Sequence, residues 1–483
     1  MTLAAVLDEI RALPGSEIIP IFNPSTEDQL GEFADGGAAA VDAAVAKARA
    51  TFESGVWRGK TSSERSRILW RVAELIEQRV DELAEIDARN GGMHINQARF
   101  IMQASAEYFR YCAGWCTKIN GIAHDIKMAG GLSGGTAEIH GYTLKEPVGV
   151  VALIVPWNGP FHTAAIKVAP ALAAGCSCVL KPAENTPLSA MVMEKILIEA
   201  GVPEGVVNVV YGLGHTTGQA LAEHPDVDKV SFTGSTATGK KIVQAAAGNL
   251  KRVMLELGGK SPVLIYNDAD LARAIPGAAM GIFAHSGQGC ICGSRIYVQR
   301  GVYDQVVAGI AQFAQHLPQG GSHEDNVSIG PLISQKQLTR VMGFIDEGKL
   351  QGVEVVTGGN RRDRKGYFVE PTVLTGVRQD MRLVKEEIFG PVVAITPFDD
   401  DEEVVRQAND SVYGLAATAW TKDLSRAHKL AKRLQAGYVT LNCQLVWDPA
   451  MPIGGYKQSG WGCEYGIDGI EAYMQTKSVY AEL

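Results

Sequence analysis

The chain has 483 residues, of which 46% are hydrophobic and 20% are charged, and it contains 54 glycines. This composition is typical of a soluble α/β protein and argues against a collagen-like, disordered or disulfide-scaffold chain, while the length predicts two or three domains. The net charge of -8 comes without a long basic run, so we expect no nucleic-acid partner.

The N-terminal segment does not have the pattern of a signal peptide, because Asp8, Glu9 and Arg11 interrupt its apolar run. The longest apolar run, at 148–157, is about half of the ~20 residues that a membrane span needs. We therefore expect a cytoplasmic protein with no membrane partner, whose cysteines are reduced thiols. The cysteine spacings match no zinc motif, so we expect no metal.

Between residues 61 and 92, apolar residues recur at spacings of three and four, which predicts one long amphipathic helix. Thr61 followed by Glu64 is a capping-box pattern at its start. Gly91 and Gly92 end the helix. The segment contains no candidate catalytic residue.

From about residue 148, short β-branched runs alternate with helical stretches. The runs lie at 148–155, 176–181, 206–212, 229–234 and 252–257. Strands that are joined by crossover helices predict a parallel sheet with ligand sites at the carboxyl ends of its strands. The residues that follow the strands are therefore the predicted functional positions, and they are 156–158, 181–184, 234–236 and 256–259.

A second alternating series begins at 261–267 and continues through 295–299, 353–359, 391–398, 414–420 and 437–442. It predicts a second α/β domain. No low-complexity linker separates the two series, so we expect the two domains to pack together with a cleft between them.

Three strand ends carry features that suit a dinucleotide. Residues 234–241 nearly match the phosphate-binding loop of nucleotide triphosphatases, but Lys241 stands where magnesium needs a hydroxyl, so only a phosphate-attracting turn remains. Residues 212–218 are one residue longer than the dinucleotide fingerprint, and an ordinary glycine turn is the alternative. Glu184, three positions after Lys181, suits the ribose hydroxyls of NAD, with a surface ion pair as the alternative.

Cys290 lies in the stretch GQGCICGSR, and a second cysteine follows two positions later. An inert buried thiol, half of a disulfide, a metal ligand and a nucleophile are the alternatives. The flanking glycines favour the nucleophile, because they let a bulky reactant approach the sulfur. A thiolate nucleophile needs a base, and Glu256 stands at a strand end of the other domain. Spacing ties no histidine to Cys290, and a papain-like pair stays open without support.

Eight segments, in this order and over essentially the whole chain, together resemble the NAD(P)-dependent aldehyde dehydrogenase superfamily. They are PWNGP (156–160), KPAE (181–184), FTGST (232–236), ELGGKSP (256–262), GQGCICGSR (287–295), EEIFGPV (386–392), Asn442 and PIGGYKQSG (452–460). The resemblance implies an α/β, aldehyde-dehydrogenase-like fold. Such a fold combines a Rossmann-type NAD-binding domain, a second α/β catalytic domain and a small β extension for oligomerisation.

The resemblance implies catalytic roles for four residues. Cys290 matches the nucleophile that attacks the aldehyde carbon, and the oxyanion that forms would be held by the Asn158 amide and the Cys290 backbone N–H. Hydride transfer to the nicotinamide then leaves a thioester. Glu256 would take a proton from the water that hydrolyses it. Lys167 resembles a residue of the family's proton path, and Cys292 is expected to be ancillary.

The resemblance also implies a cofactor site. Trp157 and Ser235 match positions at the pyrophosphate, Lys181 and Glu184 at the adenine ribose, Glu387 at the nicotinamide ribose and Phe389 at the nicotinamide ring, and Gly234, Leu257 and Gly258 belong to the same set. Because Glu184 would repel a 2′-phosphate, we expect NAD as the cofactor, with NADP disfavoured.

The domain boundaries that the resemblance implies are 1–128 with 148–258 for the NAD-binding domain and 259–460 for the catalytic domain. Residues 129–147 and 461–483 would form the extension. Such an extension pairs across subunits and covers strand edges that would otherwise stay open, so we expect a homodimer or a homotetramer built as a dimer of dimers.

Several positions depart from the family's pattern by losing bulk. Gly159 and Ala284 stand where many relatives have an aromatic residue, Ile453 replaces a phenylalanine, and Gly289 precedes the nucleophile. The space vacated is on the scale of cavities that bind aromatic molecules. The predicted substrate entrance is wide and apolar, and its residues are Gly159, His162, Ala284, Gly289, Trp447 and Ile453, with Phe161 and Ile166 as further floor residues.

A small aldehyde would lose orientation in such an entrance, so we expect an aromatic, terpenoid or other bulky apolar aldehyde as substrate. His162 and His285 leave room for a polar or phenolic group. The alternatives are a semialdehyde or a medium-chain aliphatic aldehyde. Three further alternatives are less favoured, because Cys290 and Glu256 are both present. They are a coenzyme-A-acylating enzyme, a thiol esterase and a non-enzymatic protein of the same fold.

Overall fold

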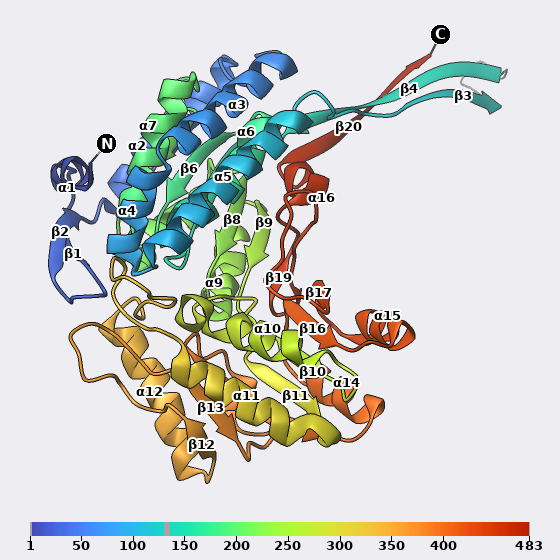
Figure 1. Ribbon diagram of the computed structural model, residues 1–483. Coiled ribbons are helices and arrows are strands. Elements are labelled where there is room, and N and C mark those ends of the chain that lie inside the picture. Colours follow the sequence, from blue (N-terminus) through green and yellow to red (C-terminus); the bar gives the residue numbers. More distant parts are fainter. Residues whose placement is uncertain (1, 130–135, 483) are drawn as a thin grey trace.

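The computed structural model describes residues 2–129 and 136–482. It has two lobes, one around a six-stranded sheet and one around a seven-stranded sheet, and a three-stranded ribbon that projects away from both (Figure 1). The mixed α/β fold with parallel sheets confirms the predicted fold class. Among the described residues, no helix is both long and apolar enough to cross a membrane.

The sheet of the first lobe has the strand order β19-β9-β8-β5-β6-β7. Its five parallel strands are β5 (Val150–Ile154), β6 (Ser177–Lys181), β7 (Val207–Val209), β8 (Lys229–Thr233) and β9 (Arg252–Glu256). All five residues of β5 and of β6 are buried, as expected for parallel strands that helices cover on both faces. The predicted strands therefore end, as expected, at one common edge.

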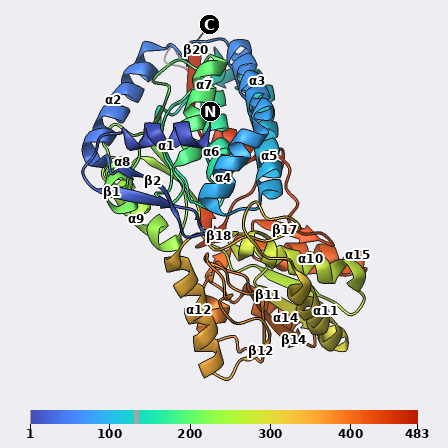
Figure 2. The ribbon, with the colours of Figure 1, turned by 60° about the vertical axis from the view of Figure 1, so that its left-hand side comes forward.

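Helices surround this sheet. They are α1 (Leu3–Arg11), α2 (Gly37–Ser54), α3 (Ser62–Gln78), α4 (Val80–Gly91), α5 (Ile95–Trp115), α6 (Pro160–Ala174), α7 (Leu188–Ala200), α8 (Gln219–Glu223) and α9 (Thr236–Ala246). The hairpin of β1 (Ile18–Phe22) and β2 (Gln29–Ala34) lies on the flank of this lobe (Figure 2).

The single helix predicted between 61 and 92 is wrong in one respect, because the chain forms two helices there. Arg79 leaves helical geometry (φ -122°, ψ 20°), so α3 ends and α4 starts in a new direction. Both helices then pack on α5 and α7. The predicted capping box of Thr61 and Glu64 is confirmed.

The sheet of the second lobe has the order β12-β13-β14-β11-β10-β16-β17. Its strands are β10 (Pro262–Ile265), β11 (Arg295–Gln299), β12 (Glu354–Thr357), β13 (Thr372–Thr375), β14 (Val392–Phe398), β16 (Ala416–Trp420) and β17 (Tyr438–Leu441). The sequence analysis missed β13, a buried run of four residues. The helices include α10 (Leu271–Phe283), α11 (Tyr303–His316), α12 (Gln335–Leu350), α13 (Arg382–Lys385), α14 (Asp401–Asn409) and α15 (Leu424–Arg433).

The projecting ribbon consists of β3 (Ala123–Ala129), β4 (Thr136–Pro147) and β20 (Met474–Glu482), all antiparallel. The boundary expected at 128 therefore falls inside β3, and residues 130–135 of the expected extension lie outside the described residues. The boundary at 461 falls inside β19 (Gly460–Trp461), which pairs with β9. Between β19 and β20, α16 (Gly466–Glu471) packs on α6. The short strands β15 (Tyr413–Gly414) and β18 (Tyr456–Lys457) pair with each other.

Candidate active site

Cys290 lies in the loop between α10 and β11, on the side of the second lobe that meets the first. Cys290 is partly exposed, whereas Cys112, Cys176 and Cys178 are completely buried. All eight cysteines are free thiols. The described residues contain no group of three or more metal-ligating side chains. Of the alternatives raised for Cys290, accessibility favours a reactive thiol over an inert core thiol.

The glycines around Cys290 allow backbone segments to approach closely. A Cβ atom at Gly259 would lie 2.3 Å from the Cys290 carbonyl oxygen, and one at Gly287 would lie 2.1 Å from the Gly390 carbonyl oxygen. Gly287 also has a φ of 71°, and His285 and Ser286 before it have φ values of 49° and 54°. Three successive residues in this left-handed region indicate a loop that tertiary packing holds in a strained shape.

Asn158 joins the two lobes at this loop. It follows β5 in the first lobe, and its Nδ2 donates a hydrogen bond of 2.9 Å to the carbonyl oxygen of Gln288 in the second. The Gln288 side chain is buried, accepts from Ile333 N at 2.9 Å and donates to Pro331 O at 3.2 Å. An amide donor is therefore fixed two residues from the thiol before any reactant arrives.

Glu256 ends β9 as a buried carboxylate, and its Oε1 has no hydrogen-bond partner among the described residues. Burial, reinforced by Glu464, raises its pKa well above the ordinary value, while Lys167 acts in the opposite direction. Lys167 Nζ donates to Glu464 Oε1 at 2.6 Å and to Ser231 Oγ at 2.9 Å. Lys167 therefore belongs to a buried polar group that reaches Glu256.

The sequence analysis missed Glu464, which it placed in the oligomerisation segment. The residue lies 297 positions from Lys167 along the chain. Lys167 could have indicated such a partner, because a lysine that is buried in an apolar helix requires an acidic group beside it.

Burial raises the pKa of the Cys290 thiol well above its usual range, and the carboxyl groups of Glu387 and Glu256 add to this effect. The resting thiol is therefore protonated at neutral pH. Reaction at this sulfur therefore requires that its proton pass to a base or that a positive charge approach it.

Glu387 approaches the same thiol from the second lobe. Its Oε1 accepts a hydrogen bond from Gly259 N at 2.9 Å, and burial raises its pKa to about 7. A Cβ at Gly258 would lie 2.4 Å from Glu387 Oε2, so a larger residue there would displace this carboxylate. Beside this carboxylate, the rings of Trp157 and Phe389 meet edge to face with centroids 5.3 Å apart.

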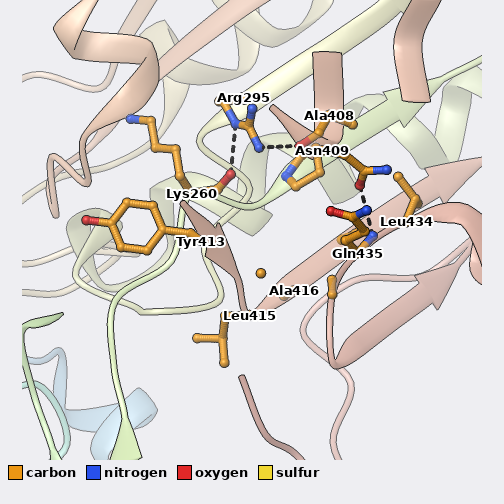
Figure 3. Close-up of a pocket in the computed structure, with 13 residues that line it drawn as sticks. Lys260, Arg295, Ala408, Asn409, Tyr413, Leu415, Ala416, Leu434 and Gln435 are labelled. Carbon is orange, nitrogen blue, oxygen red and sulfur yellow. Dashed lines mark hydrogen bonds between the residues drawn. The ribbon is translucent and has the colours of Figure 1, made fainter. Parts of the chain in front are cut away.

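Lys260 directly follows the turn formed by Gly258 and Gly259. Its side chain is buried, its Nζ has no hydrogen-bond partner among the described residues, and burial lowers its pKa to about 7. Arg295 holds the adjacent backbone, donating to Lys260 O at 2.8 Å and to Ala408 O at 2.8 Å (Figure 3). The cavity that these residues line has a volume of about 10 Å3, which suits one water molecule and no substrate.

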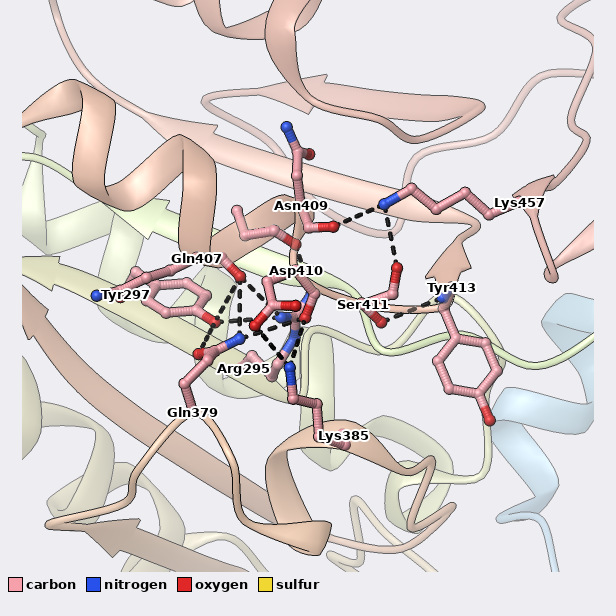
Figure 4. A network of polar contacts seen from close by, with 11 residues as sticks. Arg295, Tyr297, Gln379, Lys385, Gln407, Asn409, Asp410, Ser411, Tyr413 and Lys457 are labelled. Atoms are coloured by element: carbon pink, nitrogen blue, oxygen red, sulfur yellow. Dashed lines mark hydrogen bonds and ion pairs between the residues drawn. The ribbon is translucent and has the colours of Figure 1, made fainter.

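The backbone beyond Ala408 is held by further cations. Lys457 Nζ donates to Asn409 O at 2.7 Å and to Ser411 O at 3.1 Å, and Lys385 Nζ contacts the Asp410 carboxylate at 2.6 Å (Figure 4). Cations at the carboxyl end of α14 complement the helix dipole. This network fixes the backbone at the end of α14 and engages Arg295 and both lysines in structural hydrogen bonds.

A cavity of about 620 Å3 lies at the strand ends of the first lobe, between α8 and α9. Its lining includes Ile154, Gly214, Gly218, Phe232 and Thr238. At its edge the Ser235 hydroxyl caps α9 by accepting from Thr238 N at 3.2 Å. A helix N-terminus beside an apolar cavity of this size suits the phosphates and adenine of a dinucleotide.

Lys181 ends β6 and contacts Gly218 of the cavity lining, and Glu184 follows three residues later. Lys181 is buried, donates to Pro182 O at 2.9 Å and has its Nζ 4.0 Å from Glu184 Oε2. Glu184 is partly exposed, so its carboxylate can accept hydrogen bonds from a ribose. Gly234 follows β8, and its N–H donates to Glu256 O at 3.0 Å. Leu257 packs against α9, since a Cβ at Gly239 would lie 2.7 Å from its side chain. The residues present therefore fit a dinucleotide.

The six predicted entrance residues, Gly159, His162, Ala284, Gly289, Trp447 and Ile453, are all partly exposed. Phe161 is completely buried in the core of the first lobe, so its expected place on the floor of the entrance is wrong. Its position on α6 turns it away from the side that carries Gly159.

The space expected at His162 for a polar group is also absent. Both ring nitrogens are already hydrogen-bonded, one to Ser105 Oγ at 2.9 Å and one to the Tyr465 hydroxyl at 2.8 Å. The sequence analysis missed Ser105 and Tyr465, because each comes from a segment far from α6 in the chain.

The chain matches the model of the aldehyde dehydrogenase family over residues 12–479. An aldehyde dehydrogenase of Emericella nidulans is 44% identical over 464 residues, covering 96% of this chain and 91% of the relative. A phenylacetaldehyde dehydrogenase of Pseudomonas fluorescens is 43% identical over 462 residues, covering 95% and 91%. The structure of an aldehyde dehydrogenase from Bacillus cereus in complex with NAD+ has a TM-score of 0.95 and 44% identity, covering 100% of this chain and 98% of that one.

Proposed function

The chain belongs to the aldehyde dehydrogenase family, and from this premise we propose that it oxidises an aldehyde to the carboxylic acid with NAD as acceptor. One observation supports the proposal above all. Asn158 and Glu256, at two strand ends of the first lobe, meet the loop of Cys290 in the second lobe. The site thus combines a nucleophile, an oxyanion donor and a base.

In the first half of the reaction, the Cys290 sulfur adds to the aldehyde carbon and its proton passes to a base. The oxyanion that forms accepts from the second N–H of the Asn158 amide, while the first N–H keeps its bond to Gln288 O. When bound, NAD accepts the hydride of the thiohemiacetal. The residues that would hold it are Trp157, Lys181, Glu184, Gly234, Ser235, Leu257, Gly258, Glu387 and Phe389.

In the second half, water attacks the thioester carbonyl, and Glu256 takes a proton from it. Its free Oε1 and its raised pKa suit this base role. The carboxyl group then needs a way to pass the proton on. Lys167 and Glu464, hydrogen-bonded at 2.6 Å, both act on the pKa of Glu256, and they are the buried groups that we expect to take the proton next.

We propose NAD over NADP because Glu184 carries a negative charge at the expected ribose position. NAD is bound by the Bacillus cereus relative with 44% identity. A 2′-phosphate would meet repulsion from this carboxylate. Comparable kcat/KM values with the two cofactors would refute the preference.

For the substrate we propose a bulky apolar aldehyde, aromatic or terpenoid. At the expected entrance a Cβ at Gly159 would meet only Thr163 Oγ1, at 3.5 Å, and Ala284, Trp447 and Ile453 are partly exposed, which supports room for a bulky apolar molecule. The phenylacetaldehyde dehydrogenase relative is consistent with an aromatic substrate. A semialdehyde is less favoured, because no arginine stands at the entrance positions named.

We further propose that the ribbon of β3, β4 and β20 is an oligomerisation extension, as in a homodimer or homotetramer. Exposed apolar side chains support this, with Met128 at 53%, Leu144 at 41% and Tyr480 at 69% exposure. The first lobe would be the NAD-binding domain and the second the catalytic domain. A monomer in light scattering at assay concentration would count against the extension's role.

The test is a panel of NAD-coupled rates with benzaldehyde-like, terpenoid, long aliphatic, acidic semialdehyde and two-carbon aldehydes. The proposal predicts NADH formation with the bulky apolar members at the highest kcat/KM, with no stimulation by coenzyme A. No NADH with any aldehyde would overturn the function. Acetaldehyde as the best substrate would overturn only the substrate class.

A further inference from the structure

The glycine-rich segment 212–218 forms part of the wall of the large cavity in the first lobe. Gly214 and Gly218 line this cavity of about 620 Å3, and the residues from Gly214 to Gly218 form a single π-helical turn before α8. A Cβ at Gly218 would lie 3.4 Å from the Lys181 side chain, so the turn also packs on that lysine. Turns of this kind are rare and occur frequently at functional sites. The shape of this turn therefore bears directly on the proposed cofactor site.

Asp35, which directly follows β2, holds this segment through its carboxylate. Its Oδ1 accepts from Leu213 N at 3.2 Å and from Thr217 Oγ1 at 2.6 Å. Its Oδ2 accepts from Thr216 Oγ1. Asp35 is buried, and Thr217 lies 182 positions away from it in the chain. One side chain from the N-terminal segment thus fixes the backbone before the turn and two side chains within it.

Thr217 and Gly212 complete this lock. Thr217 is completely buried, and its Oγ1 also accepts from Gly37 N at 2.9 Å, where α2 begins. Gly212 has a φ of 152°, and a Cβ there would lie 2.0 Å from Asp35 Oδ1. The first glycine of the segment is therefore needed for the close approach of Asp35.

The carboxylate of Asp35 also acts on the cofactor site through its charge. Burial tends to raise the pKa of Asp35, but hydrogen bonds from two threonines and two backbone N–H groups outweigh burial and hold this pKa below its ordinary value. The group is therefore charged at neutral pH. Burial lowers the pKa of Lys181, and the charges of Glu184 and Asp35 act in the opposite direction. Asp35 thus helps to keep the buried lysine charged.

We propose that Asp35 is a positioning residue of the cofactor site, which holds the turn at 212–218 in the shape that binds the adenine half of NAD. The proposal rests on the NAD site proposed above and adds a residue that acts through Lys181 and the turn. When a ligand binds only the held conformation, its apparent Kd rises as the fraction of protein in that conformation falls. Loosening the turn should therefore weaken cofactor binding and leave the chemistry at Cys290 intact once the cofactor is bound.

The test is fluorescence titration of the enzyme with NADH in the absence of aldehyde, which measures Kd independently of turnover. Asp35→Ala should raise the Kd about ten- to thirtyfold. Asp35→Asn keeps one acceptor oxygen and removes the charge, so it should raise the Kd about two- to fivefold. In both variants kcat at saturating NAD should not fall by more than about twofold. Asp8→Asn, an exposed position on α1 of the same lobe, is the matched control.

A second pair of variants keeps the test decisive if Asp35→Ala fails to fold. Thr217→Val keeps the shape of the side chain without its hydroxyl and should raise the Kd for NADH about three- to tenfold, whereas Thr217→Ser should stay within about twofold of the parent. Thermal denaturation of each variant reports stability separately.

A residue that only ties the N-terminal hairpin to the first lobe would lower the Tm and leave the Kd of the folded protein unchanged. An unchanged Kd in Asp35→Ala or in Thr217→Val, with or without a lower Tm, would therefore overturn the proposal. Equal weakening in Thr217→Ser and Thr217→Val would also overturn it, because the serine keeps the hydroxyl. Absence of NADH binding in the parent enzyme would instead overturn the proposed function.

Discussion

Two carboxylates, the buried Glu256 and the partly exposed Glu387, approach Cys290 from opposite lobes, and they differ in how they are held. Glu256 at the end of β9 leaves Oε1 without a partner, whereas Glu387 in the loop before β14 accepts a backbone hydrogen bond from Gly259 at 2.9 Å. Both have a raised pKa, and both raise the pKa of the thiol. A carboxylate with a free oxygen can take a proton, and one held by a backbone N–H can position a ligand.

Burial alone does not assign a role to either carboxylate at this site. Burial is the first cause of the raised pKa in both residues, so the pKa shifts do not separate them. The hydrogen-bond partners distinguish Glu256 from Glu387. We therefore expect substitution of Glu256 to slow hydrolysis of the thioester and substitution of Glu387 to weaken binding of NAD.

Replacing Glu256 should give the largest effect. In Glu256→Gln the water that attacks the thioester has no base, so kcat should fall about a hundred- to ten-thousandfold. Hydride transfer precedes this step, so pre-steady-state absorbance should still show a burst of about one NADH per active site. The isosteric Glu387→Gln is the control and should keep steady-state turnover. A missing burst in Glu256→Gln would mean that Glu256 acts before hydride transfer.

The pH profile of the same step follows from the raised pKa of Glu256. The carboxyl group must be ionised to accept a proton, so the hydrolytic rate should be lost as pH falls through its raised pKa. Single-turnover decay of the thioester, followed against pH, measures this. A decay rate in Glu256→Gln with the same pH dependence as the parent would assign the ionisation to another group.

Asn158→Ala removes the amide donor that links the first lobe to the Cys290 loop of the second. Loss of one preorganised oxyanion donor should lower kcat about a hundred- to a thousandfold, with KM for NAD unchanged. Steady-state kinetics with varied NAD and varied aldehyde separate the two parameters. A change confined to the KM for NAD would show that Asn158 orients the cofactor and does not stabilise the oxyanion.

Glu387 should affect cofactor binding more than chemistry. Its pKa of about 7 means that the group is protonated below neutral pH and becomes a better acceptor for ribose hydroxyls above it. The KM for NAD should therefore fall several-fold as pH rises from about 6 to about 8. Glu387→Gln should flatten this dependence, and fluorescence titration with NADH is a second readout. An equally steep profile in the variant would contradict the assignment.

The smallest effect concerns the entrance, which depends on neither carboxylate. Gly159→Phe restores an aromatic side chain in the vacated space. It should reduce kcat/KM for a terpenoid aldehyde about tenfold and leave propionaldehyde within about twofold, because only the larger molecule needs that volume. Thr163→Ser is a mild control on the same face. Equal losses for both aldehydes would point to a distorted Asn158 in place of a narrowed entrance.

Much of the fold could be predicted from the sequence because buried parallel strands are continuous β-branched runs. VVALI at β5 and RIYVQ at β11 stand out between helical stretches, and their carboxyl ends carry the site. β13 was missed because TVLT is only four residues long. β3, with the sequence AHDIKMA, was missed because six of its seven residues are exposed and its apolar residues are too few to form a clear alternating pattern.

The site was predictable where residues stand beside each other in the chain, as around Cys290 and Glu256. It was not predictable where the tertiary fold brings distant segments together. Glu464 meets Lys167, and Tyr465 meets His162, across about 300 positions of sequence. No local pattern specifies such pairs, because they depend on how α16 packs on α6.

The central claim is that Cys290 carries the acyl group between the two half-reactions. The most direct measurement is intact and peptide mass spectrometry of Glu256→Gln, quenched in acid after reaction with benzaldehyde and NAD. The claim predicts a mass gain of one benzoyl group in place of one hydrogen, located on Cys290 and absent without NAD. A benzoyl group on Cys292, or a fully turned-over reaction in Cys290→Ala, would contradict it.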